Sequence, residues 1–174
     1  MVKQLWASAI IKKLLTILCI VVLLAGGSVY AYRQWRLHSI PGAVWRCLRQ
    51  PRQMTLYSIH PEEDASALVG AQLFHGYRIL GQTPVSTLAD QRHVAEAIER
   101  AVLNFPAPAS CFNPRHALRV SDDRDTYDLV ICYECGAMEV YVGDKYVGDT
   151  GFSGSPAALN SILVAGKVPL AEAQ

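Results

Sequence analysis

The sequence predicts an α+β protein in which an N-terminal transmembrane helix precedes a small antiparallel-sheet domain with one long and one short helix. An uncharged apolar run over residues 14–32 indicates the transmembrane helix. Later residues follow the alternating period of strands and, in two places, the longer period of helices. We expect a basic tail over 1–13, a transmembrane signal anchor over 14–32, a basic juxtamembrane linker over 33–52 and a soluble α+β domain over 53–174.

Charged residues are segregated along the chain. The first 50 residues hold seven Lys or Arg and no acidic residue, whereas the other 124 hold nine Lys or Arg and fifteen Asp or Glu. The formal charge is therefore +7 for the first part and −6 for the second. An acidic folded part excludes a basic nucleic-acid-binding domain. No nucleic-acid partner is expected, and the sequence indicates no small-molecule substrate.

The apolar run has the length of a membrane span. Nineteen uncharged residues form a helix about 28 Å long, close to the thickness of a bilayer's hydrocarbon layer. Lys12 and Lys13 before the run, and Ala31 at its end, also fit a cleaved signal peptide. Because Arg33 and Arg36 follow directly, we expect an uncleaved anchor.

The two ends of the anchor carry conflicting orientation signals. Three lysines precede it and five arginines follow it, which favours a cytoplasmic domain by the positive-inside rule. The signal-like order of a basic front and an apolar core favours export instead. We expect a single-pass membrane protein with its domain on the exported side, periplasmic or extracellular.

The linker alternates arginines with large apolar residues. This pattern is typical of a segment that lies in the headgroup layer, where arginine meets anionic lipid and indole rings settle at the interface. An ordinary linker broken at Pro41-Gly42 is the alternative. The residues expected at the membrane interface are Arg33, Trp35, Arg36, Trp45, Arg46 and Arg49.

The first half of the soluble domain is predicted to hold two strands and the long helix. A strand over 53–60 ends before Pro61, and a loop or a helical turn over 61–71 follows. A second strand over 74–85 contains Gly76 and Gly81, which would permit bulges. Helical periodicity over 87–105 places Leu88, Val94 and Ile98 on one face, and Thr87 with Asp90 resembles a capping box.

The second half is predicted to add four strands and the short helix. Residues 116–121 and 126–133 form a hairpin about a polar turn, and 137–142 meet 145–147 across Gly143-Asp144, a dipeptide suited to a tight turn. Ser155 and Pro156 suit the start of a helix that stops at Gly166.

Cysteine spacing is the most specific signal in the chain. Cys132 and Cys135 flank a short turn between two strands, followed by Gly136, as in a metal knuckle. Cys111 and His116 lie upstream and would complete a closed structural zinc site. The strand pattern pairs His116 near Ile131 instead of Cys132, so this site requires a bulge.

Two other arrangements of these cysteines remain open. If the domain is exported to an oxidising compartment, a disulfide from Cys111 to Cys132 or Cys135 competes with metal binding. Buried free thiols that only pack in the core are the third arrangement. A redox pair at Cys132 and Cys135 would need a helix N-terminus to activate the first thiol. A strand follows the pair here, which argues against that chemistry.

CFNPRHALRV followed by DLVICYECGAMEVY resembles a pattern of small exported or membrane-anchored bacterial proteins of uncharacterised function. The similarity covers about residues 110–142 and is weaker at LYSIHP and FHGYRILG. It singles out six residues and implies no activity. They are Cys111, Pro114, Arg115, His116, Cys132 and Cys135.

These observations predict a membrane-tethered, non-catalytic binding or accessory domain stabilised by a cysteine/histidine site, with the lipid bilayer and a protein as its partners. One alternative is an inhibitor or immunity protein that blocks a protein partner through a strand edge or the acidic face. The other is a thiol oxidoreductase that uses Cys132 and Cys135.

Overall fold

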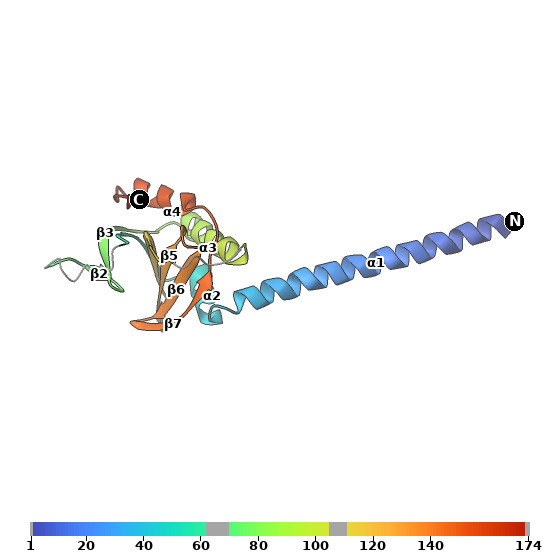
Figure 1. Ribbon diagram of the computed structural model, residues 1–174, viewed down its shortest axis with the longest axis horizontal. Helices are drawn as coiled ribbons and strands as arrows, with labels where there is room; N and C mark the ends of the chain where they lie inside the picture. The colour runs from blue at the N-terminus through green and yellow to red at the C-terminus, as the bar shows by residue number, and fades with distance from the viewer. Residues whose placement is uncertain (1, 62–69, 105–110, 173–174) are drawn as a thin grey trace. The chain divides into compact units, whose positions relative to one another are not determined.

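The computed structural model describes residues 2–61, 70–104 and 111–172, which form two compact units. Residues 1–36 make the first unit and residues 37–174 the second. Figure 1 labels their helices and strands.

The first unit is a single helix that contains the predicted anchor. Helix α1 runs over Val2–Leu37. Its stretch from Lys12 to Leu37 is long and apolar enough to cross a membrane, with a mean hydropathy of 2.4 and none of its most apolar window buried. A helix this apolar on every side is suited to lipid.

The second unit is built on one antiparallel sheet, as predicted, and three helices accompany it in the part of the chain that the structure describes. The seven strands lie in the order β2-β3-β1-β4-β5-β6-β7, and each pair of neighbours is antiparallel. The strands are β1 (Gln53–Ile59), β2 (Leu73–Phe74), β3 (Tyr77–Pro84), β4 (His116–Ser121), β5 (Thr126–Cys132), β6 (Ala137–Val142) and β7 (Lys145–Gly151). The helices are α2 (Gly42–Arg49), α3 (Leu88–Leu103) and α4 (Ala157–Ala165).

The predicted second strand is divided in the structure. His75 and Gly76 both have positive φ, 47° and 91°, and they form the tight turn between β2 and β3. Two successive left-handed residues suit the right-handed twist of a two-residue hairpin. Gly76 is thus a turn residue, and the only register shift between β1 and β3 lies near Gly81.

The long helix begins where predicted, but the first residue of its predicted apolar face is exposed. Thr87 caps α3, since its side chain accepts a hydrogen bond from the Asp90 N–H. Val94 and Ile98 are buried as expected, but Leu88 is 79% exposed. It occupies the first turn, ahead of the residues that pack on the sheet. Phe105 lies outside the described residues.

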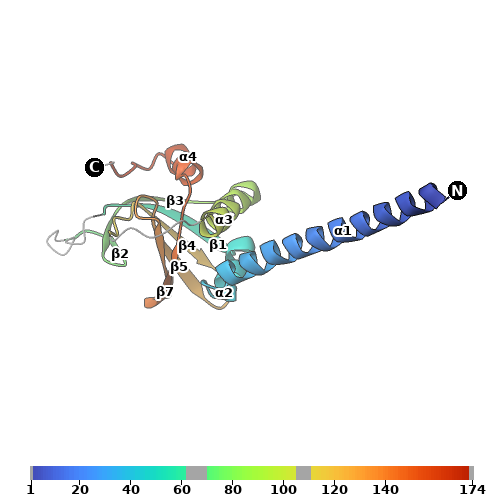
Figure 2. The same ribbon diagram turned by 45° about the vertical axis from the view of Figure 1, so that its right-hand side comes forward.

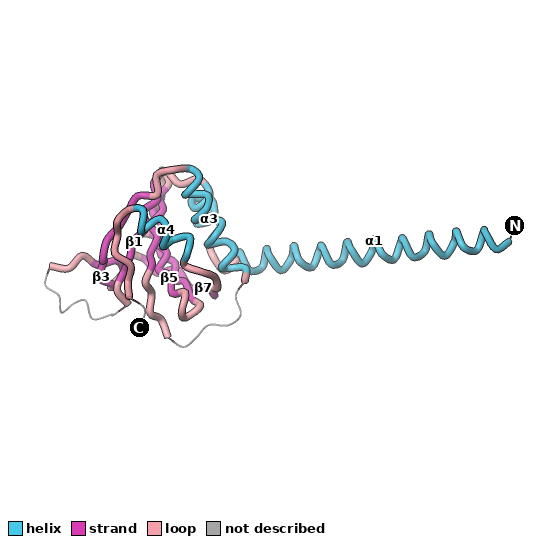
Figure 3. Tube along the Cα trace, turned by 90° about the horizontal axis from the view of Figure 1, so that it is seen from above, coloured by secondary structure: helices cyan, strands magenta, loops and turns pink. Residues whose placement is uncertain are grey.

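The sheet buries apolar residues on both faces. The larger core unites α2, α3 and α4 with one face of the central strands, and Figures 1 and 2 show α3 and α4 on the same side of the sheet. In Figure 3 these two helices lie next to each other, in agreement with their direct contacts. A smaller core on the opposite face joins the β2–β3 hairpin to the centre of the sheet. It consists of Tyr57, Ile59, Phe74, Tyr77, Ala117 and Val130.

The predicted juxtamembrane linker is partly a component of the folded domain. Val44, Trp45, Cys47 and Leu48 are buried in the larger core, because their spacing places them on one face of α2. The Trp45 indole N–H donates to the Leu37 carbonyl at 2.9 Å. Trp45 is therefore not available for the expected interface with lipid.

The other residues expected at the membrane are divided between the two units. Arg33 and Trp35 are exposed on α1, and Arg36 is half-buried there. Arg46 and Arg49 lie on the exposed side of α2. Arg49 forms an ion pair of 2.9 Å with Glu99 of α3, so it also fastens α2 to the domain.

Truncating a side chain at the centre of the larger core should destabilise the domain. Leu129→Ala removes a fully buried side chain from β5, and we expect the free energy of unfolding to fall by about 2–5 kcal/mol. Urea unfolding of the full chain in detergent micelles measures this change. Leu88→Ala is the matched control, because that side chain is mostly exposed, and we expect less than about 0.5 kcal/mol from it. Equal losses from both would contradict the assigned core.

Candidate functional site

Three of the four predicted ligand residues lie together at one end of the sheet. Cys132 is the last residue of β5, and Cys135 lies in the turn that leads to β6. A disulfide joins these two cysteines, whose Cα atoms are 5.3 Å apart. The free Cys111 places its Sγ 3.1 Å from the Sγ of Cys135. The structure thus assembles a three-sulfur cluster of Cys111, Cys132 and Cys135.

Backbone groups surround the three-sulfur cluster. The Asn113 N–H points at the Cys135 Sγ at 3.1 Å, and the Cys135 N–H points at the Cys132 Sγ at 3.0 Å. Gly136, with φ of 65°, reverses the chain directly after Cys135, a conformation that favours glycine. Cys132 and Cys135 are buried, whereas Cys111 is exposed.

His116 lies on the other face of the sheet from Cys132. Strands β4 and β5 pair without a register shift, and His116 is opposite Ile131. Since successive side chains of a strand point to opposite faces, Cys132 is directed away from the face that His116 shares with Ile131. The bulge that a four-ligand zinc site requires does not occur in this pairing.

The predicted pairing of the cysteines also differs. A bridge from Cys111 to Cys132 or Cys135 is the alternative to zinc that the sequence offers, whereas the structure joins Cys132 to Cys135. A four-residue turn brings this pair within bonding distance as the two strands reverse. With that bond in place, the described residues contain no group of three or more side chains arranged to hold a metal. Structural zinc stays a prediction.

His116 instead lines a cavity of about 340 Å³ next to the three-sulfur cluster. Its Nε2 lies 2.7 Å from Oδ1 of Asn160 on α4, and Tyr133 packs edge-on against the ring. The cavity walls come from β4, the β5–β6 turn, α4 and the C-terminal segment. The lining residues are Asn113, Arg115, His116, Tyr133, Glu134, Pro156, Asn160, Leu170 and Ala171.

Burial keeps the imidazole in its neutral form. Loss of solvent lowers the pKa of His116, and its hydrogen bond with Asn160 offsets this only in part. With the Nε2 proton donated to Asn160, Nδ1 is a hydrogen-bond acceptor. This buried atom has no partner among the described residues. The atom is closed off from solvent, so a donor in the cavity would bond it only after a movement of the side chains that cover it.

The charges beside the cavity are paired with each other. Arg115 contacts Glu134 at 2.5 Å, the pair that its position next to the turn suggests, and its Nε donates to the carbonyl of Glu172. This arginine therefore connects the start of β4 to both the cysteine turn and the C-terminal segment. The cavity presents amides, a neutral imidazole and an internally compensated ion pair.

A second polar cluster occupies the centre of the smaller core. The fully buried Asp128 accepts two hydrogen bonds from Arg119, at 2.8 and 2.6 Å, and lies 2.7 Å from Nε2 of His75. The His75 ring stacks on Tyr141, and Arg119 lies over the ring of Phe74. These contacts fasten the β2–β3 hairpin to the sheet.

The sequence contained a signal for this cluster. An aspartate in the middle of the apolar strand TYDLVIC needs a buried partner, and Arg119 is directly opposite it in the register of β4 and β5. His75 is far from both residues in sequence, so its contact with Asp128 could not be predicted without the tertiary structure. Burial alone would raise the pKa of Asp128, but the hydrogen bonds from Arg119 and His75 outweigh it and lower that pKa below its ordinary value.

No family model, curated protein or solved structure matches the chain. The proposals below therefore depend on the geometry of the described residues.

Removing the negative charge at the centre of the second polar cluster should destabilise the domain in a pH-dependent way. For Asp128→Asn we expect a loss of about 1–3 kcal/mol at neutral pH, because the substitution removes a charged acceptor from Arg119 and His75. The folded-state pKa of Asp128 is depressed. Its stabilisation is therefore present above the unfolded pKa of about 4 and is lost as pH falls through the folded value.

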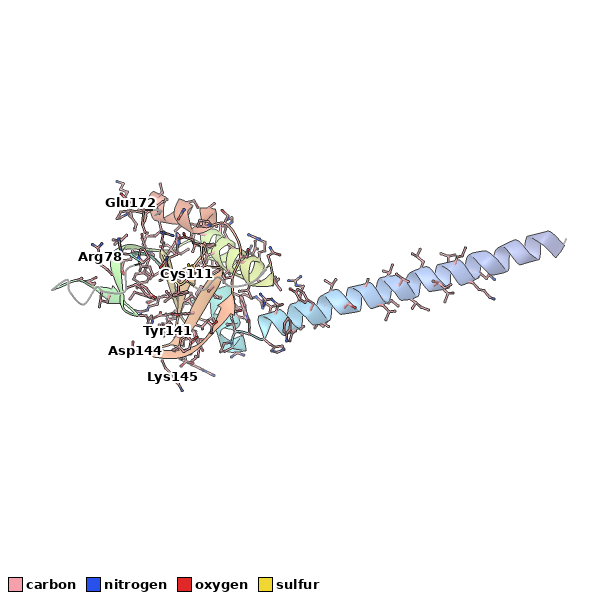
Figure 4. All side chains as sticks on the ribbon, in the orientation of Figure 1. Arg78, Cys111, Tyr141, Asp144, Lys145 and Glu172 are labelled. Carbon is pink, nitrogen blue, oxygen red and sulfur yellow. A yellow bond between two sulfur atoms is a disulfide. The ribbon has the colours of Figure 1, made fainter. Side chains whose placement is uncertain are left out.

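Urea unfolding at pH 7 and at steps below about pH 4 tests this prediction, with the wild type and the variant compared in the same micelles. Asp144→Asn is the matched control, since Asp144 is exposed at the tip of the β6–β7 hairpin, as Figure 4 shows. A difference for Asp128→Asn that persists unchanged at low pH would refute the role of the charge.

Proposed function

We propose that the chain is a single-pass membrane protein whose exported domain binds a protein partner at the cavity beside His116. Binding there requires no chemical step, so this site has a non-catalytic, accessory role. The observation that carries the proposal is a cavity whose ionic groups neutralise each other while the buried Nδ1 of His116 has no donor among the described residues.

The chemistry of the cavity indicates which part of a partner it would accept. A charged group would have to compete with the existing pair of Arg115 and Glu134. An amide or hydroxyl group can donate to His116 at lower cost, since a neutral polar group loses less hydration on burial. The exposed side chain of Leu170 adds an apolar surface at the rim. We therefore propose a polar, uncharged loop of a protein as the ligand.

Two features support the exported location. Lys12 and Lys13 precede the uncharged run in the order of a signal anchor. Disulfides persist mainly in oxidising compartments, and the domain contains one between Cys132 and Cys135. A domain exported in this way would act within reach of the membrane.

Photo-crosslinking in living cells tests the binding proposal. A photoreactive residue at Leu170, on the cavity rim, should capture one protein, whereas the same residue at the exposed Leu88, which does not line the cavity, should not. Asn160→Leu should reduce the capture at Leu170 about ten-fold, because it removes the part-buried hydrogen bond that orients His116 and a polar group that lines the cavity, at a cost of about 1–3 kcal/mol.

Ser161→Leu on the exposed side of α4 is the matched control for Asn160→Leu and should leave the capture unchanged. Equal crosslinking at Leu88 and Leu170, or a capture at Leu170 that Asn160→Leu does not reduce, would show that the cavity does not bind the partner.

The location is tested by amine labelling of intact cells with a reagent that does not cross membranes. We expect Lys145 and Lys167 to react, since both are exposed on the folded domain, and Lys12 to react only after the cells are opened. Mass spectrometry of the purified chain reads out each site. The reverse pattern would place the domain in the cytoplasm.

A further inference from the structure

The three-sulfur cluster combines an exposed thiol with a buried disulfide. Cys111 is free and exposed, and its Sγ lies 3.1 Å from the Sγ of Cys135. Cys132 and Cys135 are 0% and 1% exposed. A thiol in solution therefore has poor access to either atom of the disulfide, whereas Cys111 already touches one of them.

We propose that this cluster is a thiol–disulfide exchange site in which Cys111 connects the buried disulfide to thiols in solution. The proposal is independent of ligand binding in the cavity. Its substrates are thiol compounds, small or protein-borne, that can reach the exposed sulfur of Cys111.

The first step is an exchange within the chain. The thiolate of Cys111 attacks the Sγ of Cys135; the Cys111–Cys135 bond forms as the Cys132–Cys135 bond breaks. The electron pair leaves on Cys132, which takes up a proton in place of the one that Cys111 released. One disulfide and one thiol exist before and after, so the step needs no oxidant or reductant.

The structure supplies a partner for each form of the leaving sulfur. As a thiolate, Cys132 accepts the Cys135 N–H at 3.0 Å, and such donors stabilise a thiolate. As a thiol, it can donate to the Asn113 carbonyl at 3.4 Å. A strand follows Cys135 where a thiol-activating helix would begin, so these backbone groups take the place of a helix N-terminus.

The second step passes the disulfide to the substrate. A substrate thiolate attacks the Sγ of Cys111 in the new bridge, which forms a mixed disulfide and releases the Cys135 thiolate. A second substrate thiolate then attacks the substrate's sulfur in the mixed disulfide and releases Cys111. Two substrate thiols become one disulfide, and the bond between Cys132 and Cys135 is reduced to two thiols.

The test measures the reduction of the Cys132–Cys135 disulfide by glutathione in the full-length protein in detergent micelles. Samples are quenched with acid, alkylated and mapped by mass spectrometry. We expect Cys111→Ser to slow the reduction about ten-fold or more, because the direct route lacks the positioned thiol. Cys19→Ser, which removes the free cysteine of the membrane helix, is the control for the loss of a free thiol and should leave the rate unchanged.

A second measurement does not depend on a substitution. Wild-type protein kept at about pH 8, where more thiolate is present, and then quenched should yield peptides joined through Cys111 and Cys135 alongside the original pair. Equal rates of reduction in the wild type and Cys111→Ser, or no Cys111–Cys135 peptide, would overturn the proposal. Purified protein with one zinc per chain and all three thiols protected from alkylation would overturn it as well.

Discussion

Side chains alternate between the two faces of the sheet along β4 and β5 with no register shift, and this alternation decides which chemical groups can meet. Tyr127, Leu129 and Ile131 point into the core beneath the helices, whereas Val130 lies in the smaller core. Strand β5 is buried along nearly its whole length. A one-residue shift of its register would move every side chain to the opposite face, so the register is strongly specified. His116 and Cys132 are thereby directed to opposite faces of the sheet.

Burial on both faces also explains how the polar residues of β5 are satisfied. Asp128 and Cys132 lie on the same face of β5 as Val130 and are completely buried. A buried polar group without a partner is costly, and each has one: Arg119 and His75 hold the carboxylate, and Cys135 is bonded to Cys132. The first arrangement tethers the β2–β3 hairpin. The second closes the β5–β6 turn, and the Asn113 N–H, which points at the Cys135 Sγ, holds the segment after Cys111 against that turn.

The cavity and the three-sulfur cluster are neighbours because of Asn113. This residue lines the cavity, and its backbone N–H points at the Cys135 Sγ. Arg115, two residues further on, draws the cysteine turn and the C-terminal segment to the same place. The two proposed activities therefore use different atoms of one region, a neutral acceptor at His116 and an exposed thiol at Cys111.

The α+β class, the apolar helix, most of the strands and the capped start of α3 followed from the sequence alone, because periodicity and turn residues act over a few neighbouring positions. Tertiary structure decided the rest. It buried Trp45 in the core, turned His116 toward Asn160, placed Cys111 against Cys135 and brought His75 to Asp128. Each of these contacts depends on strand register or on chain segments distant in sequence, which spacing along the chain does not encode.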